Sequence, residues 1–123
     1  MKKEYLLIMA LITWFAITGC TTVQTPEPEI TFLNINIENN TGYECFYLYL
    51  CHVTAASWGN NILGSNILPN GQSVINGITY ILNRENRYNF RMIDSNGNIY
   101  TKWNVLLTEN EIIIFTFDDI DLL

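Results

Sequence analysis

Three sets of side chains in this sequence have the residue types needed for chemistry. His52 is the sole histidine, and with Ser57 and Asp94 it supplies the components of a hydrolytic triad. Nothing in their spacing supports a triad, and the chain has no nucleophile elbow, zinc-protease motif or phosphate-binding loop. A histidine at the end of a surface strand explains His52 without catalysis, so we do not expect an enzyme.

Acidic residues near the C-terminus form the second set, which comprises Asp118, Asp119 and Asp121. Paired carboxylates are one route to hydrolysis of glycosidic bonds. A solvated acidic tail accounts for the same cluster without any reaction. A small envelope hydrolase is therefore the less favoured alternative function.

Metal ligands form the third set. Residues 94–98 (DSNGN) have oxygen donors at alternate positions and a glycine, as the start of a calcium loop does, but lack its distant bidentate glutamate. A hairpin needs the same residues, because Asn and Gly tolerate positive φ. Cys45, Cys51 and His52 are poorly placed for zinc, since Cys45 is distant and His52 faces away from Cys51. We expect a hairpin, no metal and no cofactor, with a calcium-binding β-domain as the alternative.

Cys20 follows an apolar run, and its surroundings indicate a different role for its thiol. Residues 1–3 (MKK) are basic at the start, residues 6–17 are almost wholly apolar, and Thr18 and Gly19 are small. This order is typical of a secretory signal peptide. The run is well short of the about 20 apolar residues that a membrane-spanning helix requires.

The residues Ile17-Thr18-Gly19-Cys20 resemble the lipobox of bacterial lipoproteins, in which one aliphatic and two small residues precede the cysteine. The resemblance implies cleavage between Gly19 and Cys20, transfer of a diacylglycerol to the Cys20 thiol, and often acylation of the new amino group. Two or more acyl chains hold a protein on a bilayer, whereas one chain holds only weakly. In enteric lipoproteins an aspartate after the cysteine favours retention at the inner membrane. Thr21 stands there instead, which favours the outer membrane.

Composition sets limits on the remainder of the chain. The 123 residues are 49% apolar and 15% charged, which suits one domain with one core. After Cys20, eleven acidic residues oppose four basic ones, a net charge of −7. Such a surface repels phosphate backbones, so we expect no nucleic-acid partner.

Changes in residue pattern divide the chain into three parts. Residues 1–19 read as the lipoprotein signal peptide, residues 20–29 as a flexible tether rich in Thr and Pro, and residues 30–123 as one domain. Only residues 57–63 of the domain are suited to a helical turn, with Ser57 as its cap and Gly64 at its end.

Alternating apolar residues and intervening turn sequences predict about seven short strands in the domain. The expected strands span residues 30–38, 43–53, 72–75, 78–82, 87–94, 99–107 and 111–117. This pattern predicts an all-β fold, namely a single β-sandwich of Ig-like or transthyretin-like type. A partly closed barrel is the second choice.

The segment 43–53 (YECFYLYLCHV) is apolar on both faces, so we expect a central strand that is covered on both sides. Six extended steps of about 3.3 Å place Cys45 and Cys51 about 20 Å apart. A disulfide requires Cα atoms about 4.4 to 6.8 Å apart. We therefore predict two buried, free thiols.

Four motifs resemble those of a family of small bacterial β-domains, several of which are secreted or lipid-anchored. They are NNTGY (39–43), YLYL (47–50), SWGNNILGSNILPNGQS (57–73) and RxxDxxGxxYTKWxV (91–105). The resemblance covers Ile35 to Val105 and implies a sandwich, but no chemistry, because the family has no established activity. Cys45, Cys51 and His52 stand where hydroxyl or aliphatic residues are expected.

Aromatic residues are the best candidates for binding, because binding energy concentrates at such side chains. Trp103 shares a strand face with Ile99 and Val105, so we predict that it is buried. Trp58 lies in the irregular segment, where it either locks the loop onto the sandwich, which we favour, or contacts a partner. We therefore expect a bacterial lipoprotein attached to the bilayer through acylated Cys20. Its domain would be a non-enzymatic binding or envelope-structural module for an envelope or extracellular protein.

Overall fold

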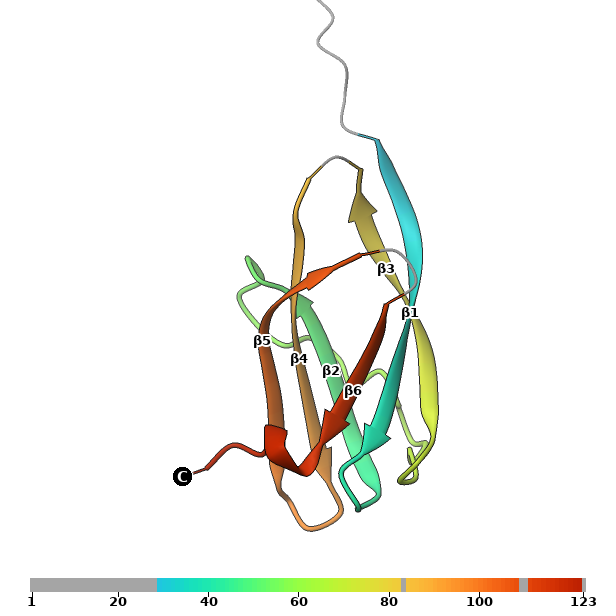
Figure 1. Ribbon diagram of the computed structural model, residues 1–123, viewed down its shortest axis with the longest axis vertical. Helices are drawn as coiled ribbons and strands as arrows, with labels where there is room; N and C mark the ends of the chain where they lie inside the picture. Colours follow the sequence, from blue (N-terminus) through green and yellow to red (C-terminus); the bar gives the residue numbers. More distant parts are fainter. Residues whose placement is uncertain (1–28, 83, 109–110, 123) are drawn as a thin grey trace, which may run out of the picture.

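The computed structural model describes residues 29–82, 84–108 and 111–122. They form two three-stranded sheets that face each other across one core, which confirms the predicted all-β sandwich (Figure 1). The predicted signal peptide, its cleavage point at Gly19 and Cys20, and the tether up to residue 28 lie outside the described residues. Within the described part of the chain, no helix is long and apolar enough to cross a membrane.

The described residues contain six strands and one short 3-10 helix. These are β1 (Ile30–Asn40), β2 (Cys45–His52), β3 (Ser73–Ile81), β4 (Asn86–Asp94), β5 (Ile99–Leu107), β6 (Ile112–Thr116) and η1 (Phe117–Asp119). The two strands expected at 72–75 and 78–82 are a single strand, β3. Gly77 continues the strand and pairs with Asn34, so the glycine does not end it.

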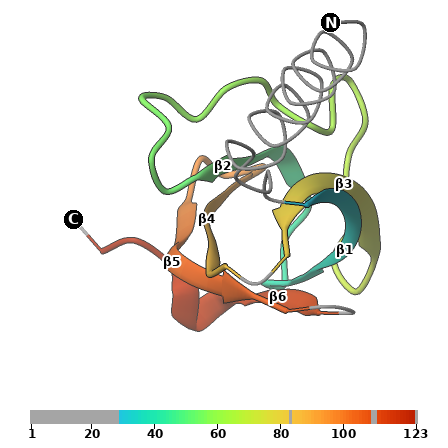
Figure 2. The ribbon, with the colours of Figure 1, turned by 90° about the horizontal axis from the view of Figure 1, so that it is seen from above.

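Apart from β4 and β5, which form a hairpin, neighbouring strands in the two sheets are not consecutive in the chain. One sheet has the order β3-β1-β6, in which β1 is antiparallel to β3 and parallel to β6. The other has the order β2-β4-β5 and is antiparallel throughout. Seen from above, β2 lies next to β3 on one side of the sandwich, and β5 lies next to β6 on the other (Figure 2).

Alternation of apolar and polar residues creates the core. On β4 every second residue from Asn86 to Asp94 is buried, as expected for a central strand with one covered face. The fully buried apolar side chains come from both sheets, namely Ile35, Ile37, Cys45, Leu48, Phe90, Met92, Tyr100 and Phe115. Their contact across the two sheets supplies the main stabilising burial of apolar surface.

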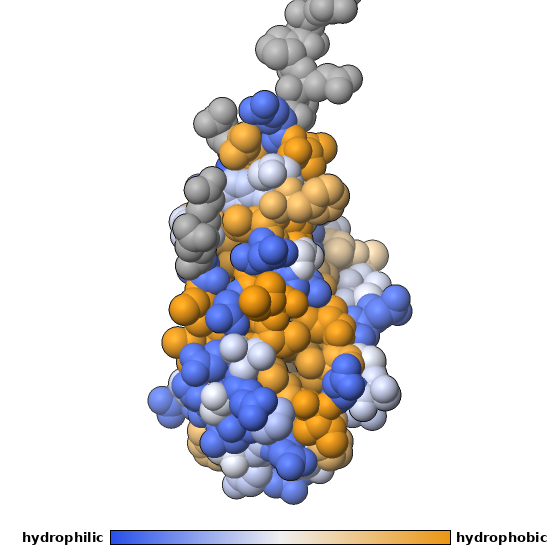
Figure 3. Space-filling view, turned by 90° about the vertical axis from the view of Figure 1, so that its right-hand side faces the viewer, coloured by the Kyte–Doolittle hydropathy of each residue, from blue (hydrophilic) through white to orange (hydrophobic). Residues whose placement is uncertain are grey.

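The outer face of the β3-β1-β6 sheet is partly apolar. Phe32, Ile75, Ile112 and Ile114 are exposed there, because their positions in the strand register alternate with those of buried neighbours. Figure 3 views the molecule from the side of β1 and β3 and shows apolar residues gathered over its middle.

The prediction that residues 43–53 form a central strand is wrong, because β2 is an edge strand with β4 as its only sheet neighbour. A bulge between Cys45 and Tyr47 places Cys45 on the same inner face as Leu48, and Tyr47 is exposed. The free edge of β2 is covered by a loop instead. Backbone hydrogen bonds join Cys45 to Leu68 in both directions, and the Ile62 N–H donates to the Leu48 carbonyl at 2.9 Å.

Both cysteines are free, as predicted, but their surroundings differ. Cys45 is fully buried, and this burial raises the pKa of its thiol to about 12. Cys51 is only partly buried, because it lies beyond the bulge on the outer face of β2. The expectation of two buried thiols therefore holds for Cys45 alone.

The prediction that Trp103 is buried is also wrong, since 62% of it is exposed. The register between β4 and β5 shifts between Tyr88 and Phe90, so β5 contains one additional residue. Asn104 at this bulge has a φ of 55°, a left-handed conformation that Asn tolerates. Tyr100 is therefore inward before the bulge, and Leu107 is inward after it.

The expected helical turn at 57–63 is absent from the described structure; residues 62–65 form a turn instead. The Asn61 side chain determines its position. Its Oδ1 accepts from the N–H groups of Leu48 and Leu63, and its Nδ2 donates to the carbonyls of Phe46 and Gly64. These four bonds fasten the loop to the edge of β2.

The C-terminal aspartates do not form a freely solvated tail. Asp119 accepts the Thr116 N–H at 2.9 Å and pairs with Lys102 at 3.0 Å. Asp121 donates its N–H to the Ile99 carbonyl at 2.7 Å and accepts the Thr101 hydroxyl at 2.7 Å. The segment therefore folds back along the first residues of β5.

Candidate functional site

The outer face of the β2-β4-β5 sheet carries a cluster that we call the aromatic site, made of Trp58, Arg91 and Trp103. Arg91 projects from the middle of β4, and Trp103 projects outward from β5 just before the bulge. Trp58 comes from the loop after β2 and covers Arg91. Two strands and one loop thus bring together residues that are up to 45 positions apart in the chain.

The aromatic rings and the guanidinium form a compact stack. The ring centroids of Trp58 and Trp103 are 5.5 Å apart with an interplanar angle of 50°. The Arg91 guanidinium carbon lies 4.6 Å from the Trp58 ring centre and 5.9 Å from that of Trp103. At these distances the cation is attracted to the ring faces, which stabilises the loop on the sheet.

Polar neighbours hold Arg91 in place. Its Nε donates to the Thr101 hydroxyl at 3.3 Å, and its Nη2 lies 4.0 Å from the Asp121 carboxylate. Because Thr101 also donates to Asp121, the three side chains form one chain of contacts. The guanidinium is therefore positioned before any partner arrives, which lowers the entropy cost of binding.

A small pocket of about 200 Å³ lies beside the two indoles. The segment Ala55–Trp58 forms one wall, and Cys51, Asn89 and Trp103 form the other. Next to it on the same face, the rings of Tyr47 and Tyr49 are stacked, with centroids 6.5 Å apart. The whole face therefore presents aromatic surface around one fixed cation.

The structure does not assemble the triad residues. His52 and Asp94 lie at opposite ends of the β2-β4 pair, where His52 pairs with Tyr88 and Asp94 pairs with Cys45. His52 packs edge-on against the Tyr88 ring at 5.3 Å, and its Nδ1 is 2.7 Å from the Thr54 hydroxyl. His52 therefore has a local structural role at the end of β2.

Residues 94–98 form the predicted hairpin between β4 and β5. Asp94 Oδ1 accepts the N–H groups of Asn96 and Asn98, while Oδ2 accepts the Asn98 amide and the Tyr100 hydroxyl at 2.7 Å. Burial raises the pKa of Asp94, but these hydrogen bonds outweigh it and leave the pKa below its usual value. Burial, together with the bond to Asp94, raises the pKa of Tyr100 to about 12. The hairpin itself occupies the carboxylate oxygens that a calcium ion would need.

Cys45, Cys51 and His52, which the sequence pattern places poorly for zinc, are also separated in the structure. Cys45 lies in the core, whereas Cys51 lies on the outer face beside Asn89. In residues 29–82, 84–108 and 111–122, no three side chains of His, Cys, Asp or Glu are grouped so that they could hold a metal ion.

Comparison with protein-family models, curated proteins and solved structures gives no match for this chain. Its function therefore has to be argued from the site. The motif residues used in the sequence resemblance have mostly structural roles. Asn39, for example, accepts from Thr41 and donates to the carbonyls of Tyr43 and Leu68 in the NNTGY turn.

Sequence reasoning identified Trp58 as a possible partner contact but missed Arg91 and the exposure of Trp103. The signal that could have found them lies in residues 91–105, where Arg91 and Trp103 stand on the two strands that the predicted 94–98 hairpin pairs with each other. The bulge hid the signal, because simple alternation from Val105 backwards assigns Trp103 to the inner face.

Proposed function

We propose that this protein is a lipid-anchored, non-enzymatic binding module of the bacterial cell envelope. The lipobox residues 17–20 support attachment through acylated Cys20, and the composition of residues 20–29 supports a tether. In this proposal the sandwich is the scaffold, and the aromatic site is the binding surface. The anchor holds that surface close to the membrane, with the outer membrane favoured over the inner one.

The aromatic site is the observation that carries the proposal. Trp, Tyr and Arg are the residue types that dominate the energetics of protein interfaces. Trp103 is 62% exposed, although it is one of the largest apolar side chains in the domain. Burial of such a side chain by a partner releases free energy that the isolated domain leaves unused. An envelope or extracellular protein is the partner class that this composition favours.

A photo-crosslinking experiment in the producing cell tests the proposal. A photoreactive amino acid replaces Tyr49, which lies on the aromatic face, and a second strain carries it at Phe32 on the opposite sheet. We expect a discrete adduct from position 49 that disappears with Trp103→Ala, and no adduct of that mass from position 32. Equal adducts at both positions, or an adduct insensitive to Trp103→Ala, would show that the aromatic site is not the binding surface.

A further inference from the structure

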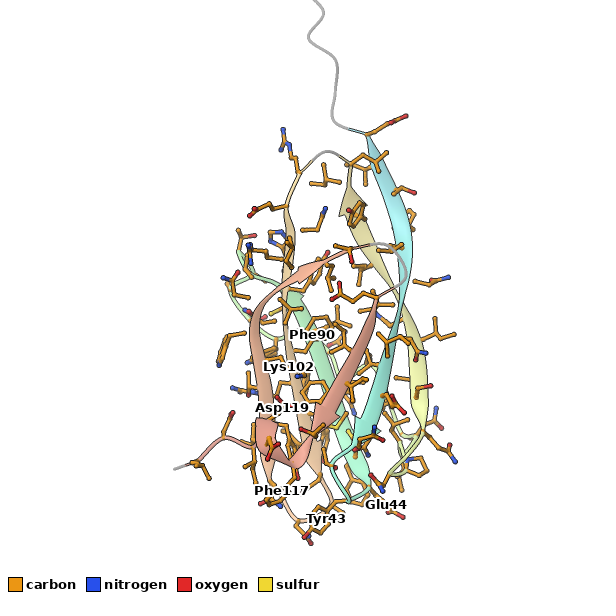
Figure 4. All side chains as sticks on the ribbon, viewed as in Figure 1. Tyr43, Glu44, Phe90, Lys102, Phe117 and Asp119 are labelled. Carbon is orange, nitrogen blue, oxygen red and sulfur yellow. The ribbon has the colours of Figure 1, made fainter. Side chains whose placement is uncertain are left out.

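The strands β5 and β6 border an open groove on one side of the sandwich. Among the described strands, β5 has β4 as its one sheet neighbour and β6 has β1. The groove between them has a volume of about 430 Å³, and its lining includes Val105 from β5 and Ile113 from β6. Figure 4 shows Lys102 and Asp119 between the two strands, where they form an ion pair at 3.0 Å.

The backbone of β6 directs hydrogen-bonding groups into this groove. The Asn36 N–H donates to the Glu111 carbonyl, and Asn36 pairs with Ile112 in the parallel register. In a parallel pair, the backbone N–H and carbonyl groups of every second residue bond the same neighbouring strand. The backbone groups of Ile113 and Phe115 therefore point to β1. The N–H and carbonyl groups of Ile112 and Ile114 consequently point to the free edge. No other described strand pairs with this edge.

The backbone of β5 shows the same alternation. The Asp94 N–H donates to the Asn98 carbonyl, so the backbone groups of Tyr100 and Lys102 also bond β4. The backbone groups of Ile99 and Thr101 point the other way, to the edge of β5 that is remote from β4. The Ile99 carbonyl accepts the Asp121 N–H, which confirms that the backbone groups of Ile99 point away from β4. Residues 119–121 already cover the start of this edge, through the Tyr100–Ile120 bridge and the bond from the Asp121 N–H to the Ile99 carbonyl. The unpaired backbone groups that border the groove are therefore those of β6.

The opposite side of the sandwich is closed by the protein itself. There, residues 61–68 run along the free edge of β2, and their backbone bonds Cys45 and Leu48. The edge of β2 is therefore covered by this loop. On the other side, residues 119–121 cover only the start of β5, and no described segment pairs with the edge of β6 at Ile112 and Ile114. Unpaired edges that accept a strand are a known basis of peptide recognition.

We propose that an extended peptide segment of a partner protein inserts between β5 and β6 and pairs with the free edge of β6. The backbone groups of Ile112 and Ile114 define this ligand chemistry, since only an extended main chain matches their spacing. In such a pair, side chains at every second position of the peptide lie beside the exposed side chains of Ile112 and Ile114, and those at the alternate positions face Val105 across the groove. The groove shares Thr101 and Trp103 with the aromatic site and its surroundings. Its strand-pairing groups lie on β6, so the proposal goes beyond the function proposed above.

Amide hydrogen exchange of the full chain in detergent tests the proposal. The probe is a ten-residue peptide that alternates Val and Thr between terminal lysines, and the control has the same composition with all valines adjacent. We expect the alternating peptide to slow exchange at the Ile112 and Ile114 amides by about tenfold or more, as for one hydrogen bond gained. Ile113 and Phe115, already bonded to β1, should change little.

Two variants at one position separate strand pairing from general apolar contact. Ile114→Pro removes an outward N–H without touching the bonds to β1, because proline is tolerated at a free edge. Ile114→Thr removes the same apolar side chain and keeps the N–H. We expect Ile114→Pro to weaken peptide binding about tenfold relative to Ile114→Thr, with unfolding midpoints of both variants measured as a control.

Three outcomes overturn the proposal. They are equal affinity of the two Ile114 variants, equal protection by the alternating and control peptides, and no protection by either peptide. A fourth outcome also overturns it: protection at Ile112 and Ile114 that appears without peptide and increases with protein concentration assigns the groove to a second copy of the chain. If Ile114→Pro does not fold, exchange in the unmodified protein still decides. Failure here leaves the aromatic site untouched, because the Tyr49 crosslink does not involve β6.

Discussion

Trp58 and Trp103 touch each other, yet they contribute differently to the domain. Trp58, in the loop after β2, is partly buried against Arg91, whereas Trp103 is mostly exposed. We expect Trp58→Ala to lower the free energy of unfolding by about 2 to 3 kcal/mol, less than for a fully buried indole. Trp103→Ala should cost less than about 1 kcal/mol while abolishing the Tyr49 crosslink. Urea denaturation of both variants measures the difference, and equal losses would contradict it.

Asp94 is a buried carboxylate whose four hydrogen bonds all come from its own hairpin region. In Asp94→Asn, the amide nitrogen that replaces Oδ2 cannot accept from the Tyr100 hydroxyl and the Asn98 amide. We therefore expect a loss of about 2 to 3 kcal/mol in the free energy of unfolding near neutral pH. Chemical denaturation followed by tryptophan fluorescence measures it, and Asp118→Asn, which alters an exposed carboxylate, is the control.

The lowered pKa of Asp94 also predicts how stability depends on pH. The folded state favours the ionised form, so its contribution is present above the unfolded pKa of 3.8 and is lost as pH falls through the lower folded-state pKa. The acid limb of the stability curve should be flatter in Asp94→Asn than in the unmodified protein. Parallel acid limbs in the two proteins would show that other carboxylates dominate acid unfolding.

The role proposed for Cys20 rests on the sequence alone. If its thiol carries the diacylglycerol, a fatty-acid analogue supplied to growing cells should label the unmodified protein and not Cys20→Ser. Cys51→Ser is the matched control, since it removes a different thiol and should keep the label. Label that persists in Cys20→Ser would contradict the lipid anchor.

Among the elements, the loop at 57–68 covers the free edge of β2, where it bonds the backbone of Cys45 and Leu48. Asn61 supplies four side-chain hydrogen bonds to it, so Asn61→Ala should lower the free energy of unfolding by about 2 kcal/mol. The Leu48 amide, which bonds Asn61 Oδ1, should also exchange faster with solvent in this variant. Asn60→Ala, at an exposed neighbouring position, should leave both measurements unchanged.

The strands were predictable because alternation and turn residues act locally. The period of residues 33–37 and the turn at 94–98 depend on neighbours in the sequence, and both predictions were correct. The bulges at Cys45–Tyr47 and at Asn104 depend on the partner strand, because only pairing shows that one strand has an additional residue. For this reason the inner position of Cys45, the exposure of Trp103 and the assembly of the aromatic site could not be predicted.

For the whole molecule, two distinct surfaces follow from one asymmetry of the sandwich. The chain between β2 and β3 closes one side and carries Trp58 onto the outer sheet face. On the side of β5 and β6, residues 119–121 cover only the start of β5, and in the described residues the groove beside β6 stays open. One small acidic domain can therefore offer a side-chain site and a backbone site to different parts of its surroundings.

The parallel pairing of β1 and β6 has a mechanical consequence. These strands are the first and last of the described chain, and the chain enters β1 at one end of the molecule and leaves β6 towards the other (Figure 1). Tension applied to the two chain ends therefore pulls the strands past each other in shear. The hydrogen bonds between residues 36–40 of β1 and residues 112–116 of β6 are then loaded at the same time instead of breaking one after another. Tension between the residues before β1 and those after β6 is therefore carried by this one seam.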